Sequence, residues 1–176
     1  MDFQRILFLS KENTIVIGGG IRMDYTKIIF VSKENVLLGP MAEWIMKSIL
    51  MDKSKQIMSR GLVVLFAEPR DQRVTELLMN HGVPCEEQVS EEFHAEQVDE
   101  TTLVLTMNFT EKVKVLEDYG VTEHVYTLRE FVQEEDGKEF DPDVPDPYGS
   151  GDEAYEECYL ELKDLLYRVK KKLQWN

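Results

Sequence analysis

One strand–loop–helix unit near the start of the chain constrains the fold more than any other feature. The apolar run KIIFV at residues 27–31 predicts a short buried strand, because β-branched and aromatic residues favour strands. Residues 40–50 (PMAEWIMKSIL) predict a helix with Pro40 at its first position. A tight loop, residues 32–39, joins the two. This order of elements directs backbone N–H groups and a helix N-terminus at one point, a geometry that binds anions.

Short apolar runs and amphipathic segments alternate to the end of the chain. Further strands are predicted at about residues 61–67, 102–107 and 124–128, and further helices at about 70–81, 110–119 and 152–173. Thr110 is the expected N-cap of the third helix. The last helix has an apolar stripe of Tyr155, Cys158, Tyr159, Leu162, Leu165, Leu166, Val169 and Leu173. This alternation implies a parallel sheet with helices on both faces, whose ligands bind at the carboxyl ends of the strands.

The residues around the loop resemble the low-molecular-weight protein tyrosine phosphatases. That family's loop runs V-C-x-x-N-x-x-R-S-P-M-A-E, and its frame survives here at Val31, Asn35 and residues 40–43. The position of the family's nucleophilic Cys holds Ser32. The position of its phosphate-clamping Arg holds Leu38, and the next position, Ser in the family, holds Gly39. The candidate remnant of the anion-binding loop comprises Ser32, Lys33, Glu34, Asn35, Val36, Leu37, Leu38 and Gly39.

A second stretch, DVPDPYG at residues 143–149, resembles the family's general-acid loop. The match implies that Asp146 stands at the general-acid position and that Tyr148 walls the substrate cleft. The family's common Ser-Ala-Gly signature is absent from the second strand region, residues 59–83. The resemblance implies a three-layer α/β fold with a four-stranded parallel sheet and helices on both faces. It extends over residues 23–176, which we predict to be one phosphatase-like domain.

The substitutions in the loop argue against the family's reaction. A thiol has an ordinary pKa of ~8.5 and is readily ionised in an anion loop, whereas the alcohol of Ser32 is a far weaker acid with no base in the motif. Leu38 cannot form the charge-assisted bonds, worth ~1.5–3 kcal/mol each, that an Arg gives to a phosphoryl group. We therefore expect a pseudophosphatase that acts as a binding or scaffold module.

An alternative is a weakly active phosphatase or hydrolase of altered specificity that uses the same loop and Asp146. In that case Ser32, Lys33 or Asp146 acts on a different substrate. Lys33 is the one cation inside the loop and could replace the Arg in part. Because it adjoins Glu34, its simpler interpretation is a solvated or ion-paired side chain.

The charge of the chain excludes some functions. The net charge is −14, and residues 133–157 hold eleven acidic side chains and one Lys. Nucleic-acid binding needs clustered Lys and Arg, so it is not expected. No apolar run approaches ~20 residues and no secretory signal is recognisable, so we expect no membrane partner and a cytoplasmic location. The expected ligand is a protein or a weakly bound phosphate or other anion.

The cysteines and histidines add no further chemistry. Cys85 and Cys158 form no disulfide framework, and neither is followed six residues later by an Arg, so the missing nucleophile has not moved to either. His94 and His124 have no metal-ligand spacing with each other or with a Cys. We therefore expect no metal and no cofactor.

The first 22 residues partly repeat the first strand and loop of the domain. Residues 6–15 (ILFLSKENTI) match residues 28–37 (IIFVSKENVL) at six of ten positions. Two interpretations stay open. The repeat either duplicates the strand and loop, adding to the sheet or competing for the same place, or is an N-terminal extension without a structural role.

Overall fold

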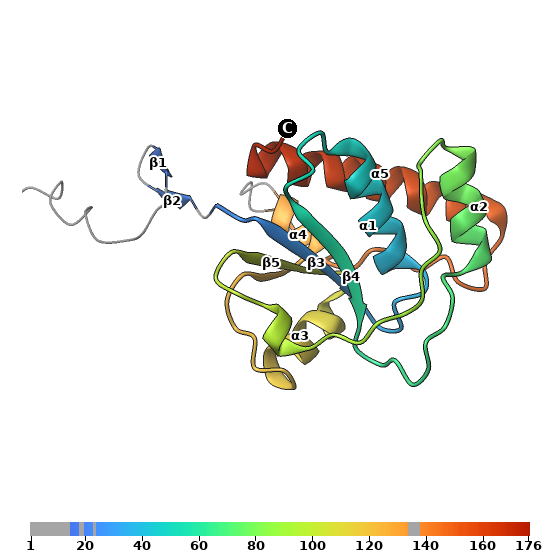
Figure 1. The fold of residues 1–176 in the computed structure, drawn as a ribbon, viewed down its shortest axis with the longest axis horizontal. Helices are drawn as coiled ribbons and strands as arrows, with labels where there is room; N and C mark the ends of the chain where they lie inside the picture. Colours follow the sequence, from blue (N-terminus) through green and yellow to red (C-terminus); the bar gives the residue numbers. More distant parts are fainter. Residues whose placement is uncertain (1–14, 18–19, 23, 134–137) are drawn as a thin grey trace, which may run out of the picture.

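The computed structural model describes residues 15–17, 20–22, 24–133 and 138–176, and its centre is a four-stranded parallel sheet (Figure 1). The strands are β3 (Lys27–Ser32), β4 (Gln56–Gly61), β5 (Thr102–Thr106) and β6 (Val125–Thr127). Their order is β4-β3-β5-β6, with every neighbouring pair parallel. β3 and β5 occupy the middle and are almost wholly buried, as their apolar sequences predict. The predicted fold class is confirmed.

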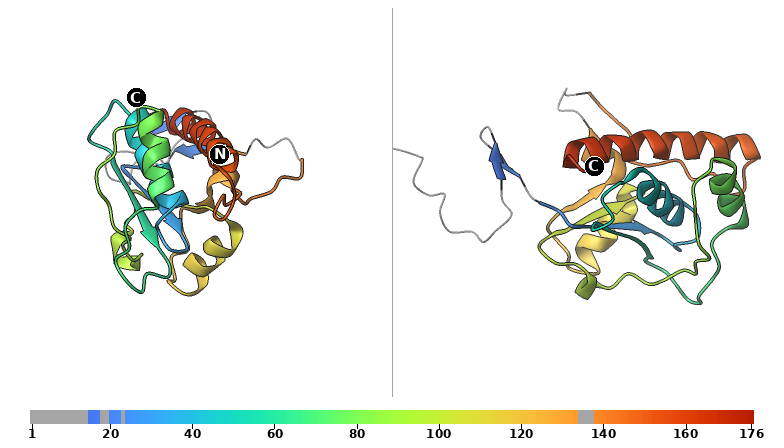
Figure 2. Two further views of the ribbon diagram at one scale, coloured as in Figure 1. Left: turned by 90° about the vertical axis from the view of Figure 1, so that its right-hand side faces the viewer. Right: turned by 45° about the horizontal axis from the view of Figure 1, so that its top comes forward.

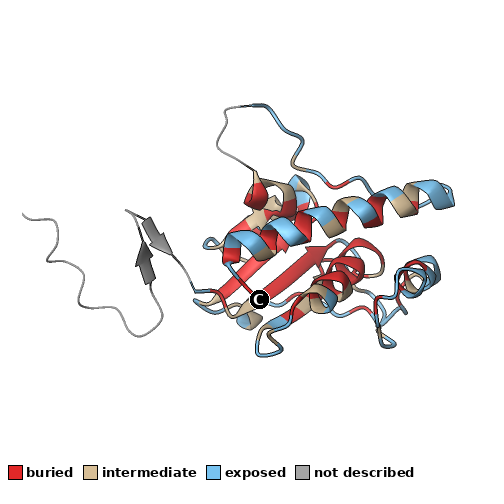
Figure 3. Cartoon of the chain, turned by 90° about the horizontal axis from the view of Figure 1, so that it is seen from above, coloured by how far each residue is buried: buried red, intermediate tan, exposed pale blue. Residues whose placement is uncertain are grey.

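Helices cover both faces of this sheet (Figures 1 and 2). They are α1 (Leu38–Ile49), α2 (Gln72–Asn80), α3 (Phe109–Glu117), α4 (Leu128–Val132) and α5 (Asp152–Leu173), with a short 3₁₀ helix at Ala95–Gln97. Side chains of α1, α2, α4 and α5 pack on one face around Ile28 and Phe30. On the other face Val115 of α3 and Phe93 pack against Ile29. The buried faces of α5 and α1 turn toward the strands (Figure 3).

The prediction from sequence agrees best with the structure at the last helix. The last helix has the predicted bounds, and all eight residues of its predicted apolar stripe are buried. Among the described residues no helix is long and apolar enough to span a bilayer.

Two strands near the N-terminus stand outside this sheet. β1 (Ile15–Ile17) and β2 (Gly20–Arg22) pair antiparallel with each other in a separate two-stranded sheet. The predicted extra strand at residues 6–9 lies outside the described residues. The division into an N-terminal extension, residues 1–22, and a domain, residues 23–176, therefore stays a prediction.

Three predicted boundaries are wrong. The second strand is not residues 61–67 but Gln56–Gly61, whose alternating burial is that of an edge strand, and the apolar run LVVLF follows it as a loop. Asn108 rather than Thr110 caps α3, because its side chain accepts the N–H of Glu111 at 2.8 Å. Pro40 is the third residue of α1 rather than the first, since the helix begins at Leu38.

Candidate functional site

The loop between β3 and α1 lies where the sequence predicts it, at the carboxyl end of the sheet. β3 ends at Ser32 and α1 begins at Leu38. The carbonyls of Ser32 and Lys33 accept the N–H groups of Leu62 and Val63 at 3.1 and 2.8 Å. The segment after β4 therefore braces this loop along one side.

A buried polar network holds the middle of the loop. Asn35 is almost fully buried, has a left-handed backbone (φ 57°) and donates through Nδ2 to the Ser59 carbonyl at 3.3 Å. Asn is among the residues that accept this conformation most readily. Glu43 accepts the Ser59 hydroxyl at 2.6 Å, which joins α1 to β4. The end of β4 reads Ser59-Arg60-Gly61, with Arg60 where the Ser-Ala-Gly signature has Ala.

Ser32 is enclosed by its own loop. The residue is 6% exposed, and its Oγ is buried with no hydrogen-bond partner. A Cβ atom added to Gly39 would lie 2.8 Å from this Oγ and 3.1 Å from Asn35 Oδ1, which also has no partner. The two oxygens are therefore packed against the bare backbone of Gly39. No described carboxylate or imidazole is hydrogen-bonded to the Ser32 hydroxyl to act as its base.

The cation that an anion loop needs is missing from the interior of this one. Leu38 is buried and joins the apolar cluster beneath α1. Lys33 points outward with 68% of its side chain exposed, and its Nζ lies 3.5 Å from Glu34 Oε1. The solvated, ion-paired interpretation of Lys33 matches this geometry better than replacement of the Arg.

The second predicted motif reaches the same edge of the sheet. The N–H of Val144 donates to the Met107 carbonyl at 2.9 Å, and Asp143 accepts the N–H of Phe109 at 2.8 Å, which ties this segment to the end of β5. Asp146 is exposed and accepts the N–H of Tyr148 at 2.9 Å, while Tyr148 is 77% exposed. Both side chains therefore face solvent.

Comparison with known proteins decides the family. The model of the low molecular weight phosphotyrosine protein phosphatase family matches residues 27–176. The chain belongs to this phosphatase family. A low molecular weight protein-tyrosine-phosphatase PtpB of Staphylococcus epidermidis is 34% identical over 131 residues, 74% of this chain and 87% of the relative. The corresponding protein of Staphylococcus aureus is 31% identical over the same shares.

Solved structures of phosphatases in this family have the same fold. A YwlE mutant from Bacillus subtilis superposes with a TM-score of 0.73 at 28% identity, covering 85% of this chain and 99% of that one. A second relative is a Cys-to-Ser mutant of the YwlE arginine phosphatase with a phosphorylated active-site serine. Its TM-score is 0.70 and its identity 30%, over 84% of this chain and 95% of that chain.

One residue that the phosphatase motifs did not single out lies between the two loops. Glu111 is buried, and its Oε2 accepts the N–H groups of Met107 and Asn108 at 2.9 and 3.1 Å. Burial is the largest cause that raises the pKa of its carboxyl to about 7, and the charge of Asp146 raises it too, while the N–H groups of Met107, Asn108 and Lys33 lower it. The spacing Asn108-x-x-Glu111 is a capping-box signal that could have identified it.

The two cysteines of this phosphatase-like chain lie outside the loop between β3 and α1. Cys158 is buried on α5, and burial is the main cause that raises the pKa of its thiol to about 12. It therefore stays protonated at neutral pH. Cys85 is partly exposed and lies at the other end of the sheet.

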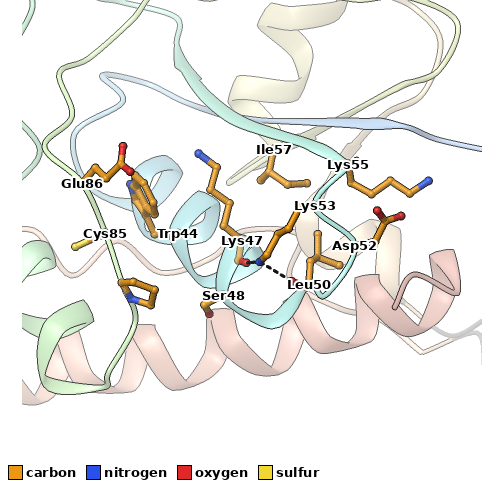
Figure 4. A pocket seen from close by; sticks show the side chains of 11 residues that line it. Trp44, Lys47, Ser48, Leu50, Asp52, Lys53, Lys55, Ile57, Cys85 and Glu86 are labelled. Carbon is orange, nitrogen blue, oxygen red and sulfur yellow. Dashed lines mark hydrogen bonds between the residues drawn. The ribbon is translucent and has the colours of Figure 1, made fainter.

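One hollow of this family member lies away from the loop between β3 and α1. It has a volume of about 510 Å³ and is formed by the C-terminal end of α1, the start of β4 and residues 84–86 (Figure 4). Trp44 and Ile57 supply apolar wall, and three lysines, Lys47, Lys53 and Lys55, line it. Lys53 donates to the carbonyls of Lys47 and Leu50 and so caps the end of α1. None of the predicted site residues lines this hollow.

Proposed function

We propose that this chain is a pseudophosphatase, a family member that keeps the fold as a binding module and has lost the hydrolytic reaction. The observation that carries the proposal is the enclosure of Ser32. A nucleophile must approach the phosphorus atom, whereas this hydroxyl is out of contact with solvent and has no hydrogen-bonded base among the described residues.

Among its described residues, the loop also has no cation placed to bind a phosphoryl group, which supports the same proposal. Charge develops on the phosphoryl oxygens during transfer, and stabilising that charge is usually the largest part of catalysis. Leu38 offers no hydrogen bond there, and Lys33 is directed to Glu34 and solvent. Asp146 has lost the leaving-group reaction that it would assist.

The test is hydrolysis of para-nitrophenyl phosphate and of phosphoarginine by the full chain. We expect release no faster than in the buffer blank, and the same result for Ser32→Ala. Turnover that disappears in Ser32→Ala contradicts the proposal. Turnover that persists in Ser32→Ala and is absent from a mock purification also contradicts the proposal. It would mean that another residue of the chain carries the reaction.

The relatives favour a second candidate, a weakly active or altered phosphatase in which Ser32 and Asp146 act. The named relatives are phosphatases, and one carries a phosphorylated serine in place of its active-site cysteine. In this chain the equivalent step would move the phosphoryl group from the donor oxygen to Ser32 Oγ, and the hydroxyl proton would leave with the donor alcohol, assisted by Asp146. It requires the loop to open around Ser32.

Intact-mass spectrometry after incubation with para-nitrophenyl phosphate separates the two candidates. The second predicts addition of one phosphoryl group that is absent in Ser32→Ala and reduced in Asp146→Asn. The first predicts an unchanged mass for all three proteins.

A further inference from the structure

Exposed apolar side chains gather on the segment between β4 and α2. Leu65 is 80% exposed and Phe66 is 75% exposed, and both lie beside the partly exposed Val63. Val89 is 48% exposed, and its backbone pairs with that of Pro69 in the same segment. Two large apolar side chains held in water next to each other mark an interaction surface more often than scattered single ones do.

This segment is held in place by hydrogen bonds of its backbone. The N–H of Val63 donates to the Lys33 carbonyl at 2.8 Å. The Ser90 hydroxyl donates to the Phe66 carbonyl at 3.1 Å and accepts the N–H of Glu68 at 2.9 Å. The apolar side chains are thus presented by a braced frame, which lowers the entropy cost of binding a partner.

A small acidic hollow lies within the same segment. Its volume is about 160 Å³, and it is lined by Glu34, Val63, Val64, Leu65, Phe66, Glu68 and Ser90. Small-molecule pockets usually measure about 300–1,000 Å³, so this hollow suits a single side chain. Two carboxylates and no cation line it. Glu34 has Lys33 at 3.5 Å, whereas Glu68 has no ion pair in the part of the chain that the structure describes.

We propose that the acidic hollow, with Leu65 and Phe66, is a docking site for a basic segment of a partner protein. One Lys or Arg side chain enters the hollow, with its aliphatic stem on the apolar wall and its charged end toward Glu34 and Glu68. An apolar residue of the same segment covers Leu65 and Phe66. The net charge of −14 attracts such a segment at long range.

The charges argue against a lipid surface as the occupant. An anionic bilayer attracts basic segments, but here the two apolar side chains are flanked by carboxylates in a strongly acidic protein. The proposal builds on the pseudophosphatase function, since it gives the class of partner that the binding module would take. The two can fail separately, because one concerns binding and the other turnover.

The experiment uses the full chain and a fluorescent nonapeptide of alternating Leu and Arg, followed by fluorescence anisotropy. We expect saturable binding that weakens as salt is added. Leu65→Ser and Phe66→Ser should each weaken it by about tenfold, as truncation of a central apolar anchor does. Glu68→Gln should weaken it by about threefold, since an exposed charge pair contributes less.

Matched controls lie on α5, away from the segment. Leu160 is an exposed apolar residue and Asp164 an exposed carboxylate there, so Leu160→Ser and Asp164→Asn should leave binding unchanged. A nonapeptide of alternating Gly and Arg should bind more weakly than the Leu–Arg peptide. Circular dichroism verifies that every variant is folded.

Three results would overturn the docking site. The first is absence of saturable binding. The second is equal weakening by the α5 variants, which means that the peptide responds only to net charge. The third is co-sedimentation of the protein with anionic phosphatidylserine vesicles that is lost in Leu65→Ser and Phe66→Ser. This result would mean that the surface contacts lipid. If the chain neither hydrolyses phosphate esters nor binds the peptide, the docking proposal fails and the pseudophosphatase proposal stands. If the chain binds the peptide and also shows turnover that depends on Ser32, only the pseudophosphatase proposal fails.

Discussion

The buried carboxyl of Glu111 gives the sharpest prediction for the candidate site. Its pKa is raised from the ordinary 4.5 to about 7, mainly by burial, so the folded chain holds a proton there that the unfolded chain has lost. Stability falls with pH wherever the folded state binds more protons, so this group lowers stability as pH rises from about 4.5 to about 7. Between pH 5 and pH 8 the loss amounts to ~2.5 kcal/mol.

Glu111→Gln removes this titration and keeps the shape of the side chain. The amide oxygen of Gln can still accept the N–H groups of Met107 and Asn108, which now bond to Oε2. We therefore expect the variant to gain stability relative to the parent as pH rises, by ~2.5 kcal/mol from pH 5 to pH 8. We predict only this change with pH. The difference in unfolding free energy at pH 5 itself also includes the effect of the altered hydrogen bonds.

Urea unfolding at several pH values between 5 and 8 measures this difference. Glu117→Gln is the matched control, since Glu117 is an exposed carboxylate on the same helix. Its difference from the parent should stay constant within ~0.5 kcal/mol, as for ordinary surface substitutions. A constant difference for Glu111→Gln as well would refute the reasoning, because the carboxyl would then titrate alike in both states.

Three further predictions concern the loop and the termini. Gly61→Ala should destabilise the fold by ~1–3 kcal/mol in urea unfolding, because the new Cβ would lie 2.6 Å from Val64 Cγ2 and 3.1 Å from Asn35 Cβ. Ser32→Cys with Leu38→Arg should bind phosphate and lower the thiol pKa in a titration, and each single change should do much less. Deletion of residues 1–22 should leave a cooperatively folding monomer by thermal melting and light scattering, and an unfolded product would place that segment in the core.

Sequence patterns predict best those parts of the fold in which a single spacing of apolar residues determines the structure. The stripe of α5 needs only one face of a helix buried over many turns, so its residues and bounds were both predictable. The loop at the end of β3 was predictable because a strand, a short loop and a helix with an early Pro allow few arrangements. The cap of α3 was missed because Asn108 and Thr110 are both acceptable caps, and the pairing with Glu111 decides between them.

The state of the candidate site depends on contacts that no short pattern contains. The sequence indicates that Ser32 replaces a Cys, but not that its hydroxyl is enclosed. That enclosure follows from the close approach of the Gly39 backbone, which a Ser at the same position would disturb. Likewise the pKa of Glu111 depends on burial between segments far apart in the chain.

The wrongly predicted strand at residues 61–67 is itself informative. A continuous apolar run usually predicts a buried strand, since burial of apolar surface stabilises the fold by ~25 cal/mol per Å². Here β4 ends at Gly61, and the run that follows exposes Leu65 and Phe66 while its backbone is bonded to Ser90 and the phosphatase-like loop. The fold gives up that stabilisation at one segment, which lies beside the loop between β3 and α1. Local rules tend to fail where function requires it, so this exposed run is where we expect the module to bind its partner.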